Sequence, residues 1–199
     1  MVRVSPTFKR LHVAGFLSLF VCSALAGVAM GCMMNIINGL ICPSYFSLFF
    51  DFPGGSSLWT TQQLYEATVE QDLKEGLGFG LVVAVVFTLF VFVVSTASCK
   101  FRFASSYLPR MTIAAFFFWF VGGLNGVLVG ATFSNSPAIV NLGATSEDRC
   151  RFLWVGGSIY GAYFGGLIAL FLGCTWFKRD WKKSKSLQAF STENEDDQP

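Results

Sequence analysis

The chain contains GGLNGVLVG at residues 122–130 and GGSIYGAYFGG at residues 156–166, and these two stretches decide how it folds. In both, glycine recurs at every fourth residue, which places the glycines on one face of a helix. The aligned glycines are Gly122, Gly126 and Gly130 in the first stretch and Gly157, Gly161 and Gly165 in the second. Such a row lets another helix backbone approach closely, which favours helix packing in lipid. Glycine is also common in membrane helices generally, but two aligned triplets favour the packing role.

The composition around these stretches is typical of a membrane protein. Of the 199 residues, 53% are hydrophobic and only 13% are charged, whereas soluble domains carry about 25% charged residues. The mean hydropathy is +0.56. Four apolar segments reach the length of about 20 residues that crosses a bilayer, and they lie at residues 11–34, 77–98, 111–133 and 152–177. The sequence therefore predicts an all-α integral membrane four-helix bundle.

The first segment has one alternative interpretation, a cleaved signal peptide. Basic residues precede it, and Ala24-Leu25-Ala26 resembles a cleavage site. However, the apolar run continues past Met30, and is longer than the roughly 7–15 residues of a signal-peptide core. We therefore expect a membrane helix.

Basic residues predict the orientation. Most lysines and arginines lie at residues 1–10, 99–110 and 178–185, and few lie in the other connections. Under the positive-inside rule, both termini are then cytoplasmic. We expect a cytoplasmic tail at residues 1–10, a larger first outer loop at 35–76, a second outer loop at 134–151, and a disordered cytoplasmic tail at 178–199.

The first outer loop carries further local signals. Asn35 and Asn38 are expected to cap the first helix, and residues 60–75 have the spacing of a short amphipathic helix. The aromatic residues between Tyr45 and Phe52 suit the bilayer interface or, as the alternative, a partner contact. The glycines of Gly76-Leu-Gly-Phe-Gly80 indicate either close packing or a flexible entry into the second span.

Two further features bear on packing within the membrane. Gly27 and Gly31 form a smaller version of the glycine face in the first span. Asn125 is the strongly polar side chain inside the third span, and we expect it to face the bundle, where it can find a hydrogen-bond partner. The expected arrangement is a left-handed or mixed bundle in which the third and fourth helices are tightly apposed.

The six cysteines divide by position. Cys42 and Cys150 fall in the two outer loops, where an oxidising compartment would favour a disulfide between them. Cys99 and Cys174 lie beside the cytoplasmic face and are candidates for S-acylation. Cys22 and Cys32 lie within the first span and are expected to be buried.

The sequence offers no pattern for catalysis. It contains no metal-ligand cluster, nucleophile motif or phosphate-binding loop, so we expect no enzyme activity, metal or cofactor. Nothing indicates nucleic-acid binding. The expected partners are the lipid bilayer and other membrane proteins, or further copies of the chain, through lateral helix contacts.

The layout of four helices, internal termini and a larger first outer loop resembles the tetraspan superfamilies. Claudins and calcium-channel gamma subunits share this plan, with a Gly-Leu-Trp…Cys…Cys signature where this chain has Ser57-Leu58-Trp59 and one cysteine. Tetraspanins carry Cys-Cys-Gly in a large second outer loop, which this chain lacks. MARVEL-type proteins and clarins have fewer fixed motifs, and their layout resembles residues 11–177 more closely. The resemblance implies organisation of vesicle or junction membranes.

These observations favour a non-enzymatic membrane organiser or accessory subunit of the plasma membrane or of secretory or vesicle membranes. The alternatives are an oligomeric channel or pore, with Asn125 and the glycines along its path, and a carrier of small molecules or lipid.

Overall fold

The computed structural model describes residues 6–43, 45, 61–95, 99–133, 136 and 145–196. Its helices are α1 (Pro6–Ile41), α3 (Thr61–Ser95), α4 (Phe101–Ser105), α5 (Leu108–Thr132) and α7 (Ser146–Asp196). Ser57-Leu58-Trp59, most of the aromatic stretch before it and most of the second outer loop lie outside the described residues.

Four stretches of this helical chain are long and apolar enough to cross a membrane. They are Val13–Ile41, Leu73–Ser95, Phe101–Thr132 and Ser146–Ser186. The described part of the chain is thus an all-α, multi-pass membrane protein with four spans.

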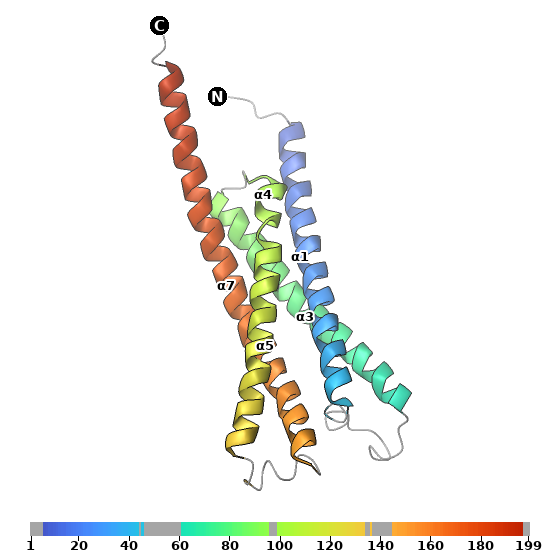
Figure 1. The fold of residues 1–199 in the computed structure, drawn as a ribbon. Helices are drawn as coiled ribbons and strands as arrows, with labels where there is room; N and C mark the ends of the chain where they lie inside the picture. The colour runs from blue at the N-terminus through green and yellow to red at the C-terminus, as the bar shows by residue number, and fades with distance from the viewer. Residues whose placement is uncertain are drawn as a thin grey trace.

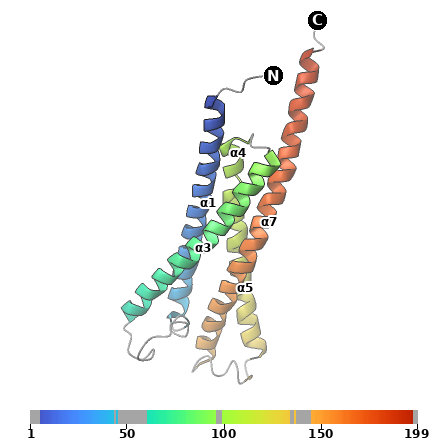
Figure 2. The same ribbon diagram turned by 180° about the vertical axis from the view of Figure 1, so that it is seen from behind.

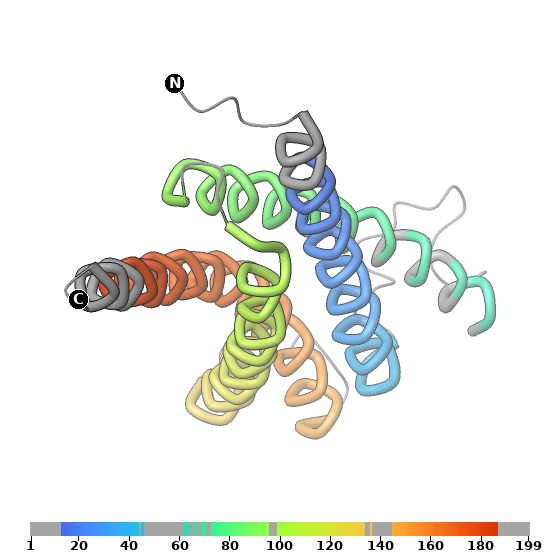
Figure 3. Tube along the Cα trace, turned by 90° about the horizontal axis from the view of Figure 1, so that it is seen from above, coloured from blue at the N-terminus to red at the C-terminus, as the bar shows by residue number. Residues whose placement is uncertain are grey.

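The spans form two helix pairs. α1 packs along α3 and α5 packs along α7, whereas contacts between the two pairs are much sparser. The first helix begins and the last helix ends at one end of the molecule, which we call the terminal end (Figure 1). The connections from α1 to α3 and from α5 to α7 lie at the opposite end, the loop end, as the reverse view also shows (Figure 2). Seen along the bundle, the members of each pair cross and splay apart (Figure 3).

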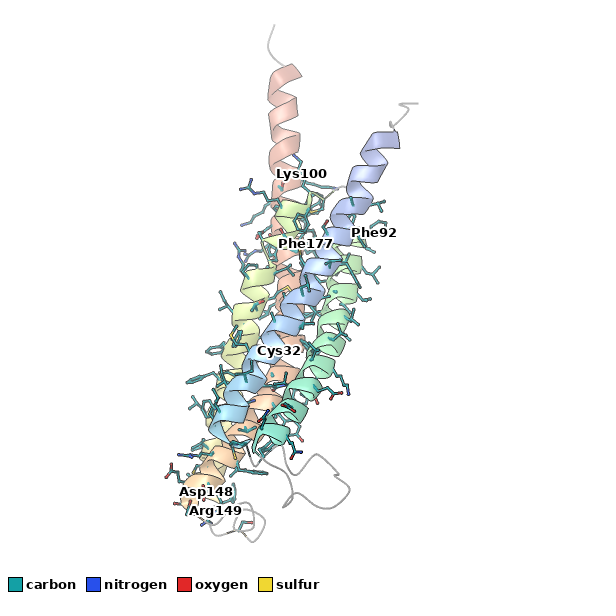
Figure 4. The ribbon with its side chains drawn as sticks, turned by 90° about the vertical axis from the view of Figure 1, so that its right-hand side faces the viewer. Cys32, Phe92, Lys100, Asp148, Arg149 and Phe177 are labelled. Atoms are coloured by element: carbon teal, nitrogen blue, oxygen red, sulfur yellow. The ribbon has the colours of Figure 1, made fainter. Side chains whose placement is uncertain are left out.

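Apolar side chains fill the bundle in three clusters along its length. The largest lies at the terminal end and includes Phe87 and Phe177, both fully buried, with ring centres 6.4 Å apart. A middle cluster surrounds Trp119, and a loop-end cluster surrounds Val155. In Figure 4, Phe177 lies toward the terminal end and Asp148 at the loop end.

The first two spans differ from expectation in their bounds. α1 continues through Asn35 and Asn38 to Ile41, so these asparagines do not cap it. Residues 61–75 of the predicted amphipathic segment and the second span form one continuous helix, α3. This helix contains no proline. Side chains four residues apart form hydrogen bonds in its polar part, and the Lys74 Nζ–Glu70 Oε1 distance is 2.7 Å. Glycines 76, 78 and 80 do not interrupt this helix.

The C-terminal segment also differs from expectation, because α7 is helical as far as Asp196 rather than disordered from residue 178. Residues 178–196 contain neither glycine nor proline, and seven of these 19 residues are lysine, arginine or glutamate. These residue types favour helix, and elongating an existing helix costs far less than starting one.

Candidate functional site

The interface between α5 and α7 is a seam of glycines in which the two backbones touch. A Cβ atom added to Gly122 would lie 2.7 Å from Gly161 Cα, and one added to Gly157 would lie 2.9 Å from Gly126 Cα. Both distances are too short for carbon atoms, so a side chain at either position would force the helices apart. The row of glycines on each helix, which we call its glycine ladder, therefore packs directly against the glycine ladder of the other helix.

Side chains close the two ends of this seam. A Cβ atom on Gly130 would lie 2.6 Å from Leu153 Cδ1, and one on Gly165 would lie 2.8 Å from Phe118 Cγ. All six ladder glycines thus lie along one interface within the chain.

A second glycine seam joins α1 to α3. A Cβ atom on Gly27 would lie 3.0 Å from Gly80 N, and one on Gly80 would lie 2.6 Å from Ala24 O. One turn nearer the loop end, a Cβ atom on Gly76 would lie 3.6 Å from Gly31 Cα. Of the two interpretations open for Gly76 and Gly80, the structure supports close packing.

One edge of the α5–α7 seam is open and forms a depression, the lateral groove, of about 490 Å³. Its walls include Gly122, Asn125, Val129, Leu153, Tyr160 and Phe164. The Tyr160 and Phe164 side chains are exposed on this surface, so they face lipid. The groove offers a polar amide in a wall that is otherwise apolar except for tyrosine hydroxyl groups.

That amide belongs to Asn125, whose position differs from expectation. Its side chain is exposed on the outer surface of α5 and does not face the bundle. It lies seven residues before the end of α5 at Thr132, a depth of about 10 Å at 1.5 Å per residue. The reason is helical phase: Gly122 and Gly126 occupy the face turned toward α7, and Asn125 is rotated to its edge.

A side-chain amide that does face the bundle is that of Asn38, for which the sequence predicts a helix cap. Asn38 and Ser158 are both fully buried, and Ser158 Oγ lies 2.9 Å from Asn38 Oδ1. This contact joins α1 to α7 across the two helix pairs. The signal available in the sequence was register, because Asn38 follows Gly27, Gly31 and Met34 along one helix face.

Two cavities lie end to end between the helix pairs. The loop-end cavity, of about 50 Å³, is lined by residues that include Met34, Asn38 and Glu75. The central cavity, of about 30 Å³, is apolar except for hydroxyl groups. Both share Gly27, Met30 and Phe79 in their walls.

The chemistry that these sites offer is hydrogen bonding and apolar contact. At the mouth of the loop-end cavity, Tyr163 donates a hydrogen bond of 2.7 Å to the Glu75 carboxylate. Across the described ranges, no three His, Cys, Asp or Glu side chains gather as metal ligands.

The predicted disulfide between Cys42 and Cys150 is not present in the structure. Cys42 is buried at the end of α1, where its neighbours in the loop-end cluster are Tyr45 and Val155. Cys150 is partly exposed in the first turns of α7. Both cysteines lie at the loop end, but Cys42 is packed into apolar surroundings.

The acylation candidates Cys99 and Cys174 are both buried in the terminal-end cluster. Burial raises the pKa of the Cys99 thiol to about 11. A buried, protonated thiol is a poor nucleophile, so acylation at Cys99 would require this end of the bundle to open. Cys22, expected to be buried, is exposed on the surface of α1.

The terminal end is held by a polar contact beside these cysteines. Tyr107, directly before α5, donates a hydrogen bond of 3.0 Å to Asp180 Oδ2 of α7. The Tyr107 ring also contacts the Phe177 ring of α7, with ring centres 5.7 Å apart. These contacts fix the start of α5 against the part of α7 that leaves the bundle.

Comparison with protein-family models, with curated proteins and with solved structures finds no match to this chain. The class defined by the fold is that of a four-span, multi-pass membrane protein.

Proposed function

We propose that this protein is a non-enzymatic membrane organiser or accessory subunit, and that it binds the transmembrane helix of another membrane protein in the lateral groove. This assigns partner binding to the open edge of the α5–α7 seam. The glycine faces themselves are covered by helices of the same chain.

The observation that supports this proposal is the exposure of Asn125 within the span. In the described part of the chain, no hydrogen bond to its side chain is found. An amide left without a partner in an apolar medium costs about 1–3 kcal/mol by protein mutational data. Polar side chains in membrane helices therefore tend to meet a partner in a neighbouring helix.

The shape of the groove is consistent with a helix as the occupant. Glycines form its floor, while Tyr160 and Phe164 stand at one side, so a partner backbone can approach near Asn125. Hydrogen bonds between membrane helices contribute only about 0.6 kcal/mol on average. The amide would thus specify register and partner, and apolar packing would supply most of the affinity.

The orientation belongs to this proposal as well. The terminal end carries basic residues in the first turns of α1, in the segment from Lys100 to Arg110, and in α7 after its apolar part. We place it in the cytoplasm under the positive-inside rule, in a plasma, secretory or vesicle membrane. The α7 extension then projects into the cytoplasm.

A pore formed by several copies is the rival function. Within one chain, the cavities between the helix pairs measure only about 30 and 50 Å³. A conducting path would therefore have to run between copies that meet at the lateral groove. Lipid carriage is the other alternative.

The test is photocrosslinking from inside the groove. A photoreactive amino acid replaces Asn125 in the full chain in its native membrane, and a matched variant carries it at Ile113. Ile113 lies in the same helix, is 69% exposed, and does not line the groove. We expect position 125 to crosslink one membrane protein and position 113 to crosslink lipid.

A second variant tests whether partner binding depends on the Asn125 amide. Asn125→Leu should lower recovery of the partner in mild detergent without changing the melting temperature of the isolated protein. Crosslinks to lipid alone at both positions would contradict the proposal. Crosslinks to a second copy would favour the pore, and conductance in liposomes altered by Asn125→Ala would then be the decisive measurement.

A further inference from the structure

The loop-end cavity holds a buried amide whose hydrogen-bonding capacity is only partly used. Asn38 is fully buried, and its Nδ2 has no hydrogen-bond partner among the described residues. Its Oδ1 lies 2.9 Å from Ser158 Oγ. A side-chain amide has two donor hydrogens and an acceptor oxygen, so Asn38 retains at least one unused site.

The Ser158 hydroxyl leaves one group of the Asn38 amide without a hydrogen bond in either of its two possible orientations. Its Oγ lies 2.9 Å from both Asn38 Oδ1 and Val155 O, but a hydroxyl carries only one proton. If the proton goes to Asn38, the amide nitrogen of Asn38 is unused. If it goes to Val155 O, the Asn38 amide turns to donate to Ser158, and its oxygen is unused. A ligand hydroxyl satisfies either case, because it both donates and accepts.

The mouth of the cavity restricts the charge of the ligand. Glu75, in the first turns of the span of α3, is exposed there and lines the cavity together with Asn38. Its negative charge disfavours phosphate and carboxylate head groups. A cation beside Asn38 would lie among Met30, Met34 and Phe79, where losing its hydration is costly. An uncharged polar head fits both constraints.

From the Asn38 amide toward the terminal end, the cavity continues as a mainly apolar slot. The central cavity follows the loop-end cavity along α1 as far as Ser23. From Asn38 to Ser23 is 15 residues of helix, or about 22 Å. The slot therefore extends from the loop end past the middle of the α1 span, and its polar side chains Asn35, Asn38, Glu75 and Tyr163 lie in the loop-end cavity.

The slot lies where the bundle is able to widen. It separates the α1–α3 pair from the α5–α7 pair, and contacts between these pairs are sparse. The loop-end and central cavities measure about 50 and 30 Å³, so a ligand can occupy them only if the two helix pairs move apart. A small shift of one rigid helix pair against the other would admit a thin apolar body without opening either glycine seam.

We propose that the two cavities form one binding site for a neutral membrane lipid whose head is a single hydroxyl group. The hydroxyl bonds to the Asn38 amide at the loop end, and the apolar body lies beside Met30 and Phe79. Sterols and long-chain alcohols share this chemistry. The site is independent of the lateral groove and of any protein partner.

The test uses the purified full chain in lipid nanodiscs. Three photoreactive probes are compared, namely a sterol, a long-chain fatty alcohol and a phosphatidylcholine, and the labelled peptides are mapped by mass spectrometry. We expect a hydroxyl lipid to label α1 near Met30 and Met34, and α3 near Phe79. Phosphatidylcholine should label outward positions such as Val93.

Asn38→Leu should lower labelling of these peptides by about tenfold, which corresponds to the loss of one buried hydrogen bond. Thr132→Leu is the matched control, because it removes an exposed polar side chain at the loop end of α5 and Thr132 lines neither the slot nor the lateral groove. Its labelling should equal that of the unmodified protein.

Competition in the unmodified protein keeps the test valid if Asn38→Leu does not fold. An unlabelled hydroxyl lipid should compete at least about tenfold better than the corresponding hydrocarbon without the hydroxyl group, which can neither donate nor accept a hydrogen bond. Labelling by the sterol alone would assign the site to rigid ring lipids, and labelling by the alcohol alone would assign it to flexible chains. Equal competition by the hydrocarbon, identical labelling by all three probes, or unchanged labelling in Asn38→Leu would overturn the proposal.

Discussion

Gly122 of α5 and Gly161 of α7 lie in backbone contact, so that a Cβ atom on Gly122 would be only 2.7 Å from Gly161 Cα. The relationship is reciprocal, since a Cβ atom on Gly161 would lie 2.9 Å from Gly122 Cα. Neither obstruction is a flexible side-chain tip that can turn away. The spacing of the two helices is therefore set by the absence of side chains at these positions.

Gly161→Leu should destabilise the protein by about 3 kcal/mol or more, because overpacking costs about 1–3 kcal/mol even where neighbouring side chains can adjust. Thermal unfolding in detergent measures the change. Gly78→Leu is the matched control, because a Cβ atom at Gly78 meets no atom within 4 Å. If both variants melt at the same temperature, the seam does not determine stability.

The α1–α3 seam permits a finer comparison within one helix. Alanine is favoured over glycine in a helix by about 1 kcal/mol, so Gly78→Ala should leave stability unchanged or raise it. Gly80→Ala should lower stability, because its Cβ would lie 2.6 Å from Ala24 O. The difference in melting temperature between the two variants isolates the contact. A stabilising Gly80→Ala would contradict the close approach of α1 and α3.

The Tyr107–Asp180 hydrogen bond predicts that removing the Tyr107 hydroxyl lowers the stability of the protein. Tyr107→Phe removes the hydroxyl that donates to Asp180 Oδ2 at 3.0 Å, and should cost about 1 kcal/mol. Tyr160→Phe removes a hydroxyl that is exposed on the lateral groove, so it should leave the melting temperature unchanged. Equal effects from the two variants would show that the Tyr107 hydroxyl does not join α5 to α7.

The Cys99 thiol should react slowly and with a shifted pH dependence. Its pKa is raised to about 11 by burial, so the thiolate is scarce at neutral pH. Alkylation in detergent should accelerate about tenfold per pH unit from pH 8 to 10, because only the thiolate attacks. Single-cysteine variants measured by mass spectrometry test this, with the partly exposed Cys150 as the accessible reference. Rapid labelling of Cys99 at pH 7 would show that this end opens readily, which would favour acylation there.

The sequence by itself was sufficient for the helical class and the packing residues. Apolar length predicts the four spans, because backbone groups in lipid must be satisfied within a helix. The four-residue spacing of glycine predicts flat helix faces on the first, third and fourth spans. Which face meets which is also well constrained, because α5 and α7 carry ladders of equal length and are consecutive spans.

Helix ends were less predictable, for a physical reason. Hydrophobicity marks where the membrane begins, but a helix ends only where residues break it. The polar segments at residues 61–72 and 178–196 contain no glycine or proline, so α3 and α7 extend well beyond their apolar portions.

Only the tertiary structure decided which polar side chains meet across the bundle. Asn125 and Asn38 both occur in spans with glycine faces, and composition does not distinguish them. Asn125 is turned outward because the adjacent glycines occupy the α7 side, whereas Asn38 is buried because Ser158 of α7 lies opposite. A cross-bundle contact of this kind depends on how two helix pairs dock, and no local pattern in either segment encodes that geometry. The same holds for Cys42, whose loop position suggested a disulfide, but whose side chain packs beside Val155.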